Sequence, residues 1–407
     1  MRTALRFLLR ANKWFRGSAV SSVGCIFICE RIILHIEPQN SSLLSVSMDF
    51  QSRLEQAVRE AKPPLPKQPL SIIVVGSGGI VHDAHLPAYA KAGFPVAALV
   101  DANPERAATL AKKFSVPLAT SSLDEAVAKS PKNSVFDVAV PAGSILDVLP
   151  RLPDGSAALI QKPMGNTMAE AEEILAICRK KGMTAAVNFQ LRYAPVMLAA
   201  RRVTDAGLLG ELHDMEVRVN VFMPWELWSF LATAPRLEIL YHSIHYIDLV
   251  RSWFGNPERV LAKTVRNPKT AQLAATKSLI TLDYREWKRV YIATNHGHKY
   301  KNSQHSYVQW EGTEGALHAV MGVNLDYPKG RPDTLSFARP EEDWQTLPTE
   351  GSWFPDAFIG SMGSLQAYVT GDAPMLPTSV EDAIDTMRTV EAAYISNERD
   401  GVPLTGK

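Results

Sequence analysis

Between residues 70 and 190 the chain alternates short apolar runs with longer segments in which apolar residues recur every three or four positions. The apolar runs predict strands, and the longer segments predict amphipathic helices. Strands are expected at 72–75, 96–100, 136–140, 157–160 and 184–189, with helices at about 87–92, 104–114, 123–129 and 168–180. Because strands that alternate with helices form a parallel, doubly wound sheet, this region predicts an α/β domain.

Beyond Arg192 the pattern changes to extended segments with few helices between them. A helix at about 195–206 ends at Gly207, a residue that favours helix C-termini. The extended segments lie at 212–222, 260–265, 278–284, 290–295, 306–310 and 317–320, and a helix at about 241–254 interrupts them. Residues 191–407 are therefore expected to form a second, α+β domain with a large, mostly antiparallel open sheet. An amphipathic helix at 379–399 should pack back on the body.

Residues 1–69 read as an N-terminal extension followed by the proline-rich linker 62–69, disordered or partly helical. Basic residues precede the first acid, Glu30, which leaves two interpretations open. One is a mitochondrial-type targeting peptide. The other, which we favour, is that translation starts at Met48, where an ordinary helix begins. The expected location is then the cytoplasm, with the mitochondrion as the alternative. Polar residues interrupt the apolar stretch 19–36, so we expect no membrane span.

The composition is that of an ordinary globular protein, with 46% hydrophobic and 21% charged residues among 407. A formal net charge of +1 provides no basic field for nucleic acid, so a small ligand is the expected partner. Of the three cysteines, only Cys178 lies in the expected fold, which gives no disulfide framework and fits a reducing compartment.

A glycine-rich loop follows the first strand and precedes a helix. Gly76 permits a tight turn, and Gly78 allows the backbone to approach a pyrophosphate at the N-terminus of the helix. Asp101 ends the next strand, where an acid accepts the adenosine ribose hydroxyls. Val81 replaces the third glycine of the full fingerprint. The order of these features predicts a dinucleotide site. Asp101 favours NAD over NADP, although Arg106 on the following helix leaves NADP open.

Lys162 stands between Gln161 and Pro163 at the end of a buried strand. A lysine at such a place is often only a solvated surface residue. The proline, however, restricts the turn and keeps the lysine close to the backbone. The carboxyl edge of a parallel sheet is where ligands bind, and a lysine there can stabilise a developing alkoxide during hydride transfer.

With these features the chain resembles the Gfo/Idh/MocA oxidoreductase family from about Leu70 to Leu404. The matching pieces, in chain order, are Gly76-Ser-Gly-Gly79, His85-Leu-Pro-Ala88, Asp101-Ala-Asn-Pro-Glu-Arg-Ala107, Lys162-Pro163, Asn188-Phe-Gln-Leu-Arg192-Tyr-Ala-Pro195, Ala206-Gly-Leu-Leu-Gly-Glu211, His245-Tyr-Ile-Asp248 and Gly312-Thr-Glu-Gly315. The resemblance implies a Rossmann domain, a C-terminal domain built on an open sheet, and a nicotinamide cofactor. It also implies that the Lys-Pro bond is commonly cis and that the lysine and a later histidine flank the reacting carbon.

His245 matches that histidine, and an imidazole of near-neutral pKa suits a general base for an alcohol proton. Three positions depart from the family pattern, and they leave Lys162 and His245 in place. Tyr241 stands where an acid is usual, Gln161 replaces the glutamate before the Lys-Pro pair, and Val140 replaces the threonine before Pro141. The expected cofactor contacts are Gly76, Gly78, Gly79, Ile80, Asp101, Pro141, Gln161, Lys162 and Asn188.

Two further groups of residues carry alternative readings. The acids and histidines Glu238, His242, His245, Asp248, His296 and His298 offer metal-ligand chemistry. Scattered histidines on one helix are more often hydrogen-bonded pocket residues, so we expect no metal. The tryptophans Trp225 and Trp228 either stack on a sugar ring or pack under a loop.

The sequence thus predicts an NAD-dependent dehydrogenase that oxidises a secondary hydroxyl of a sugar, polyol or sugar-acid derivative. His245 takes the proton, Lys162 orients the oxygen, and Arg192, Tyr241, His242 and Asp248 hold the substrate. A redox-assisted NAD-dependent glycosidase and a non-catalytic NAD(P)-sensing regulator are the alternatives. A homo-oligomer formed through the C-terminal sheet is also expected.

Overall fold

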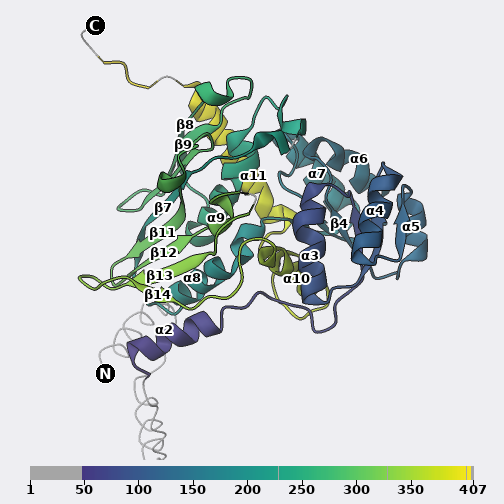
Figure 1. Ribbon diagram of the computed structural model, residues 1–407, viewed down its shortest axis with the longest axis horizontal. Helices are drawn as coiled ribbons and strands as arrows, with labels where there is room; N and C mark the ends of the chain where they lie inside the picture. Colours follow the sequence, from purple (N-terminus) through teal and green to yellow (C-terminus); the bar gives the residue numbers. More distant parts are fainter. Residues whose placement is uncertain (1–47, 228, 328, 400, 405–407) are drawn as a thin grey trace, which may run out of the picture. The chain divides into compact units, whose positions relative to one another are not determined.

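The computed structural model describes residues 48–227, 229–327, 329–399 and 401–404 (Figure 1). The predictions of a targeting peptide and of disorder before Met48 concern residues outside these ranges. Within them, no helix is long and apolar enough to cross a membrane.

The first sheet is parallel throughout, with strand order β3-β2-β1-β4-β5-β6, and confirms the predicted doubly wound α/β fold. Its strands are β1 (Ile72–Val75), β2 (Val96–Val100), β3 (Leu118–Thr120), β4 (Val135–Val138), β5 (Ala157–Ile160) and β6 (Thr184–Val187). Strands β1, β4 and β5 are buried at every position, as expected for strands covered by helices on both faces. The helices of this domain are α3 (Leu86–Ala92), α4 (Pro104–Phe114), α5 (Leu123–Lys129), α6 (Ile145–Val148) and α7 (Met168–Lys180).

The second sheet has the strand order β14-β13-β12-β11-β7-β10-β9-β8, and only the β7–β10 pair in it is parallel. Its strands are β7 (Leu212–Asn220), β8 (Arg259–Val265), β9 (Lys277–Asp283), β10 (Arg289–Asn295), β11 (His305–Gly312), β12 (Ala316–Val320), β13 (Thr334–Ala338) and β14 (Gln345–Leu347). Side chains alternate between buried and more exposed positions along β9 and β11, and between half-buried and exposed positions along the edge strand β8, so one face of the sheet is covered and the other is open. The predicted large, mostly antiparallel sheet is confirmed. The structure adds β3, β13 and β14, which the sequence did not predict.

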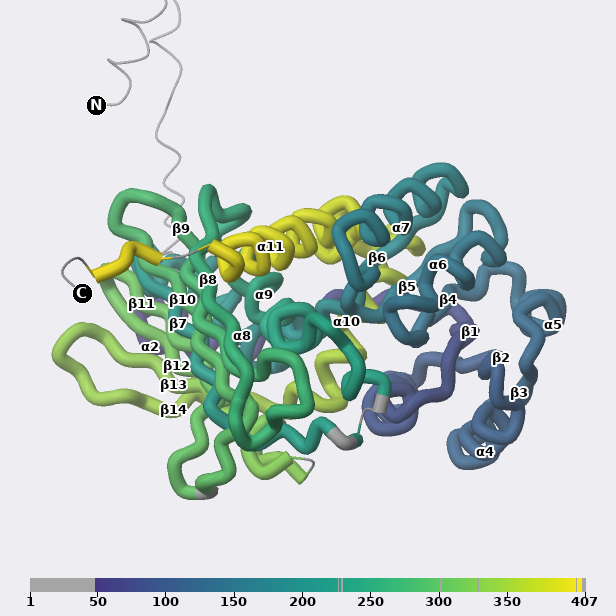
Figure 2. The backbone as a smooth tube through the Cα atoms, turned by 90° about the horizontal axis from the view of Figure 1, so that it is seen from above, coloured from purple at the N-terminus to yellow at the C-terminus, as the bar shows by residue number. Residues whose placement is uncertain are grey.

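Four helices complete this half of the chain: α8 (Pro195–Asp205), α9 (Ile244–Phe254), α10 (Asp356–Val369) and α11 (Val380–Glu398). Helix α10 was not predicted from the sequence. It contacts α3 and β5 of the first domain. Helix α11 contacts β8 of the second sheet as well as α7 and β6 of the first domain, and Figure 2 shows it running between the two. These helices join the two sheets.

Residues 49–65 pack against the rest of the fold. Helix α2 (Phe50–Arg59) begins after Asp49, whose side chain accepts a hydrogen bond from the Ser52 amide, and Leu54 is fully buried where the helix contacts α8. The linker then passes so close to α10 that only glycine fits there. A Cβ atom at Gly363 would lie 2.7 Å from Leu65 Cδ2. This part of the predicted extension therefore contributes to the core.

Candidate active site

The glycine loop after β1 has the backbone that a dinucleotide site requires. Gly76 has φ 102°, and a Cβ there would lie 2.4 Å from the Ala139 carbonyl oxygen, so no other residue fits without a shift. A Cβ at Gly78, in contrast, would meet no atom within 4 Å. The loop thus turns tightly against the end of β4 and leaves open space at its tip. This arrangement fits a pyrophosphate.

Val81 occupies the place of the third glycine, and the helix begins differently as a result. Residues Val81–His85 form a π-helical turn that leads into α3, and Val81 itself is fully buried. The Gly78 carbonyl accepts hydrogen bonds from the Val81 and His82 amides, both at 3.1 Å. A π-helical turn is wider than an α-helical one, and here the buried Val81 is its first residue. Ile80 directly precedes this turn.

Asp101 lies beside the glycine loop at the end of β2. Its carboxylate accepts hydrogen bonds from the Ser77 amide at 2.7 Å and from the Asn103 amide at 2.8 Å. The Arg106 guanidinium is 3.9 Å away. The acid is therefore fixed in orientation next to the loop, as its predicted role toward a ribose requires.

Lys162 reaches from the first domain to the helix that carries His245. The Lys162-Pro163 bond is cis, and Lys162 Nζ donates a hydrogen bond to the Tyr241 carbonyl oxygen at 2.8 Å. Burial lowers the pKa of Lys162 from its ordinary value to about 8. Near neutral pH this lysine is thus a proton donor whose proton leaves more easily than that of a surface lysine.

His245 lies in α9 and is 7% exposed. Burial, followed by the charge of Lys162, lowers the pKa of His245 well below its usual range, so its imidazole is neutral. Its Nδ1 has no hydrogen-bond partner among the described residues, and the Trp353 ring lies edge-on at a centroid distance of 5.9 Å. The imidazole is therefore in the neutral form that can accept a proton, but its lowered pKa makes it a weaker base than the near-neutral imidazole expected from the sequence.

A buried pair of residues lies behind Lys162. His85 Nδ1 is 2.6 Å from Asp137 Oδ2, and its Nε2 faces the amide nitrogens of Gln161 and Asn188, both at 3.4 Å. Gln161 Oε1 accepts a hydrogen bond from the Lys162 amide at 2.9 Å. This pair fixes the orientation of two residues predicted to contact the cofactor. From the sequence, His85 was predicted only as part of a family motif, and Asp137 was not predicted. The sole local signal for Asp137 was a charged residue inside an apolar strand.

Tyr241 and His242 lie in a π-helical turn, Ile239–Ser243, that precedes α9. The Tyr241 hydroxyl donates to Asn166 Oδ1 at 2.9 Å, which directs this side chain toward the first domain. The His242 ring lies 4.7 Å from that of Trp225 and 4.6 Å from that of His296. Burial, and then the charges of neighbouring His296, Lys162 and His245, lower the pKa of His242 well below its usual range. His242 therefore adjoins the Lys162–His245 pair as a neutral side chain.

Arg192 and Asp248, both predicted to hold substrate, bind one another. Arg192 donates from Nε and Nη2 to the two Asp248 oxygens, each at 2.6 Å, and Nη2 also contacts Asp382 on α11 at 2.8 Å. Thr386 adds a hydrogen bond to Asp248 at 3.1 Å. The network fixes α9, and hence His245, against α11. A substrate role for either residue stays a prediction, and this network gives both a structural role.

The remaining predicted positions are spread over the structure. Pro141 is exposed after β4, and Asn188 is buried after β6. His298 Nε2 contacts Ser303 Oγ at 2.9 Å and does not join His296. Trp225 is buried under its loop, while Trp228 lies outside the described residues. Across the described ranges no three acids, histidines or cysteines are grouped so that they hold a metal ion.

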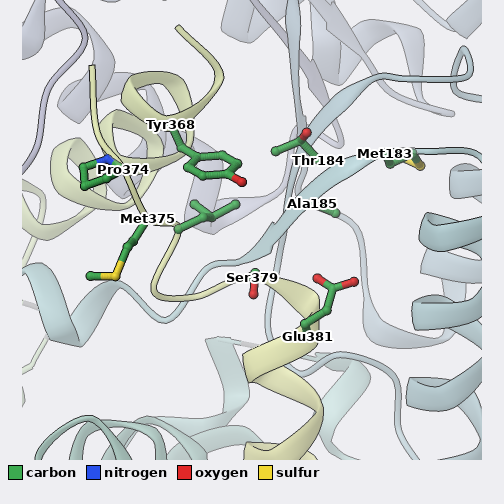
Figure 3. Close-up of a pocket in the computed structure, with 9 residues that line it drawn as sticks. Met183, Thr184, Ala185, Tyr368, Pro374, Met375, Ser379 and Glu381 are labelled. Atoms are coloured by element: carbon green, nitrogen blue, oxygen red, sulfur yellow. The ribbon is translucent and has the colours of Figure 1, made fainter. Parts of the chain in front are cut away.

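A surface hollow of about 410 Å³ opens along the edge strand β6 (Figure 3). Its lining includes Met183 and Thr184 at the start of the strand, together with Tyr368 and Met375. Ligands in doubly wound sheets bind outside the carboxyl ends of the strands, whereas this hollow lies at the amino end of β6. It shares no residue with the site around Lys162 and His245.

A tight glycine loop with an acid at the next strand end, on a doubly wound sheet, defines a dinucleotide-binding oxidoreductase. Residues 70–189 match the oxidoreductase family with an NAD-binding Rossmann fold, and residues 197–318 match the GFO/IDH/MocA C-terminal domain. The chain belongs to this family, which confirms the resemblance, the enzyme class and the NAD-binding fold predicted from the sequence.

Curated and solved relatives agree with this assignment. D-apiose dehydrogenase of Paraburkholderia graminis is 26% identical over 317 residues, which cover 75% of this chain and 81% of that protein. An oxidoreductase from Agrobacterium radiobacter, solved with NAD+, L-tartaric acid and magnesium, has a TM-score of 0.68 at 19% identity and covers 81% of this chain and 96% of its own. Aldose-aldose oxidoreductase from Caulobacter crescentus, solved with glycerol, has a TM-score of 0.68 at 16% identity, over 81% of this chain and 98% of its own. The two solved structures share the fold of this chain.

Proposed function

We propose that this protein is an NAD-dependent dehydrogenase that oxidises a secondary hydroxyl group of a sugar, polyol or sugar-acid derivative. The main support for this proposal is that Lys162 and His245 lie close to one another at the carboxyl edge of the first sheet. Burial and then the charge of Lys162 lower the pKa of His245, and its Nδ1 has no hydrogen-bond partner in the described part of the chain. The names of D-apiose dehydrogenase and aldose-aldose oxidoreductase add support for a carbohydrate substrate.

In this proposal His245 accepts the hydroxyl proton and Lys162 donates a hydrogen bond to the same oxygen, which stabilises the negative charge that develops on it. Bound NAD supplies the hydride acceptor. Gly76 and Gly78 would hold its pyrophosphate, and Gln161 and Asn188, whose amide nitrogens face His85, would contact the cofactor. The Arg192–Asp248 pair positions α9.

Asp101 supports NAD as the preferred cofactor. Its carboxylate lies next to the loop and is oriented by two backbone amides. A dianionic 2′-phosphate placed against it is repelled, and the Arg106 guanidinium is 3.9 Å from the acid and exposed. The open face of the second sheet carries exposed Leu261 and Leu279, which supports the expected homo-oligomer.

The experiment is a panel of sugars, polyols and sugar acids read by NADH formation, with Lys162→Met and His245→Ala beside the wild type. Each substitution should lower kcat about 10²-fold or more, because removing an oxyanion donor costs about 10²–10³ and removing a general base about 10²–10⁴. Affinity for NAD, measured by calorimetry, should stay nearly unchanged.

Matched controls are Lys132→Met and His305→Ala, which change the same residue types at exposed positions and should leave turnover unchanged. Near-full turnover of both site variants would contradict the proposal and make the Lys-Pro turn structural. Glycoside cleavage without net NADH would favour the redox-assisted glycosidase.

A further inference from the structure

A second group of buried polar side chains adjoins the Lys162–His245 pair. We call Glu238, Ser243, His242, His296 and Trp225 the Glu238 cluster. Glu238 Oε1 accepts a hydrogen bond from Ser243 Oγ at 2.8 Å and lies 3.2 Å from His296 Nε2. The His242 ring contacts both His296 and Trp225. The residues come from the loop after β7, the turn before α9 and the end of β10, so the fold brings together three distant segments.

The base of the cluster is a carboxylate paired with an imidazole. Burial raises the pKa of Glu238, but the hydrogen bond and charge of His296, with the hydroxyl of Ser243, lower it below its ordinary value overall. Glu238 is therefore a carboxylate at neutral pH, although its side chain is fully buried. His242, between this pair and Lys162, is neutral.

Three polar atoms of the cluster are buried and have no hydrogen-bond partner among the residues that the structure describes: Glu238 Oε2, His296 Nδ1 and Trp225 Nε1. The first is an acceptor, the indole nitrogen is a donor, and the imidazole nitrogen is either one. Buried polar groups in folded proteins are almost always hydrogen-bonded, and exceptions grouped in one place indicate a missing partner. Two of them belong to the Trp225 and His296 rings, which pack on His242. The neighbour of His242 along the chain, Tyr241, accepts the hydrogen bond from Lys162.

We propose that the Glu238 cluster binds the non-reacting hydroxyl groups of the substrate, and that the substrate is a neutral sugar or polyol rather than a sugar acid. This inference rests on the proposed function. A hydroxyl group both donates and accepts, so one hydroxyl satisfies Glu238 Oε2 and its neighbour accepts from Trp225 Nε1. A carboxylate only accepts, leaves Glu238 Oε2 without a donor and faces a like charge.

The arginines near α9 do not offset that charge. Arg192 is bound by both oxygens of Asp248, and Arg251 contacts Asp382 and Thr386. Lys162 is engaged with the reacting oxygen in the proposed mechanism. A substrate carboxylate would therefore lack the guanidinium partner that buried carboxylates usually have.

The first test is Trp225→Phe, which removes the indole donor and keeps an aromatic ring. We expect kcat/KM for neutral sugars to fall about threefold to tenfold, the effect of one lost neutral hydrogen bond, with most of the change in KM. Trp310→Phe is the matched control. Its Nε1 is also buried without a partner, but its ring packs on Trp253 near the far end of α9, so kcat/KM should not change.

The second test is Glu238→Gln, assayed with matched probes: D-glucose with D-glucuronate, and D-xylose with D-xylonate. The wild type should favour the neutral member of each pair, and the variant should lose that preference by on the order of tenfold, since an amide donates to a carboxylate. Wild-type preference for the acids, or an unchanged ratio in both Glu238→Gln and Trp225→Phe, overturns the inference.

Failure of the proposed function gives a different result, namely no NADH from any member of the panel. The inference is then tested by binding alone. The same four probes are added to the NADH-loaded wild type and to NADH-loaded Trp225→Phe, and the rise in unfolding temperature that each probe causes is measured. A larger shift with the neutral probes that shrinks in the variant supports a neutral-hydroxyl site. Equal shifts in the two proteins overturn it.

Discussion

At the scale of single residues, the proposed chemistry depends on the protonation states of two side chains, and burial lowers the pKa of both. Burial disfavours the charged form of both Lys162 and His245. For His245 the result is a neutral imidazole at all pH values near 7. For Lys162 the pKa falls to about 8, so its ammonium form is lost just above neutral pH.

The pH profile of kcat/KM in the direction of alcohol oxidation tests this assignment. If the Lys162 ammonium stabilises the substrate oxygen, kcat/KM should be flat from about pH 6.5 upward and fall as pH rises through about 8. The neutral His245 adds no limb in that range. A profile that rises through pH 8 instead would contradict the assignment and make Lys162 the proton acceptor.

The sequence could predict those residues whose role shows in the residues directly beside them along the chain. Gly76 and Asp101 follow strands directly, and the structure places Asp101 beside the glycine loop, where its carboxylate accepts a hydrogen bond from the Ser77 amide. The His85–Asp137 pair was not predicted because its members are 52 positions apart, and each alone resembles an ordinary polar residue. The Arg192–Asp248 bond was missed for the same reason, since it joins residues 56 positions apart.

At the scale of elements, α10 is a helix that the helix propensities of its residues do not predict. Its sequence contains Gly360, Ser361, Gly363 and Ser364, residues that weaken a helix, so no helix was predicted there. The helix forms because small residues let it pack closely. A Cβ at Gly360 would lie 2.5 Å from Tyr193 Cβ and 2.9 Å from Pro63 Cβ. Packing against two other segments outweighs the local preference.

Gly360→Ala should therefore destabilise the protein, although alanine is the better helix former by about 1 kcal/mol. Overpacking costs about 1–3 kcal/mol, and the atoms in the way are Cβ atoms, which cannot rotate aside. Urea unfolding should show a lower midpoint. Gly401→Ala, where an added Cβ meets nothing within 4 Å, is the control. An unchanged or higher midpoint for Gly360→Ala would show that α10 moves freely relative to Tyr193.

At the scale of the whole molecule, residues that precede the proline-rich segment also pack against the two domains, which the sequence did not predict. Leu54 is fully buried against the second domain, and the Phe50 ring lies 5.6 Å from that of Phe337. The linker that follows passes over α10. The chain before β1 thus contributes packing to both halves of the molecule.

Two shortened chains test this boundary. A chain that begins at Met48 should bind NAD and unfold at the same temperature as the full chain, because it keeps α2. A chain that begins at Ala61 should lose about 2–5 kcal/mol of stability, the usual cost of removing a large buried side chain, and unfold several degrees lower. Failure of the Met48 chain to fold would make the preceding residues structural, and equal unfolding temperatures for all three would make α2 dispensable.

The hydrogen bond from Lys162 to the Tyr241 carbonyl has a consequence for how binding energy is used. The ammonium group has three N–H donors, and this bond uses one of them to hold the side chain in place, so another N–H can meet an arriving substrate oxygen. In the ground state that oxygen is a neutral acceptor, and a hydrogen bond to it adds only modestly to substrate affinity. Once the oxygen becomes an alkoxide both partners are charged, and the bond is stronger. The gain is then confined to the transition state, where it raises turnover rather than affinity.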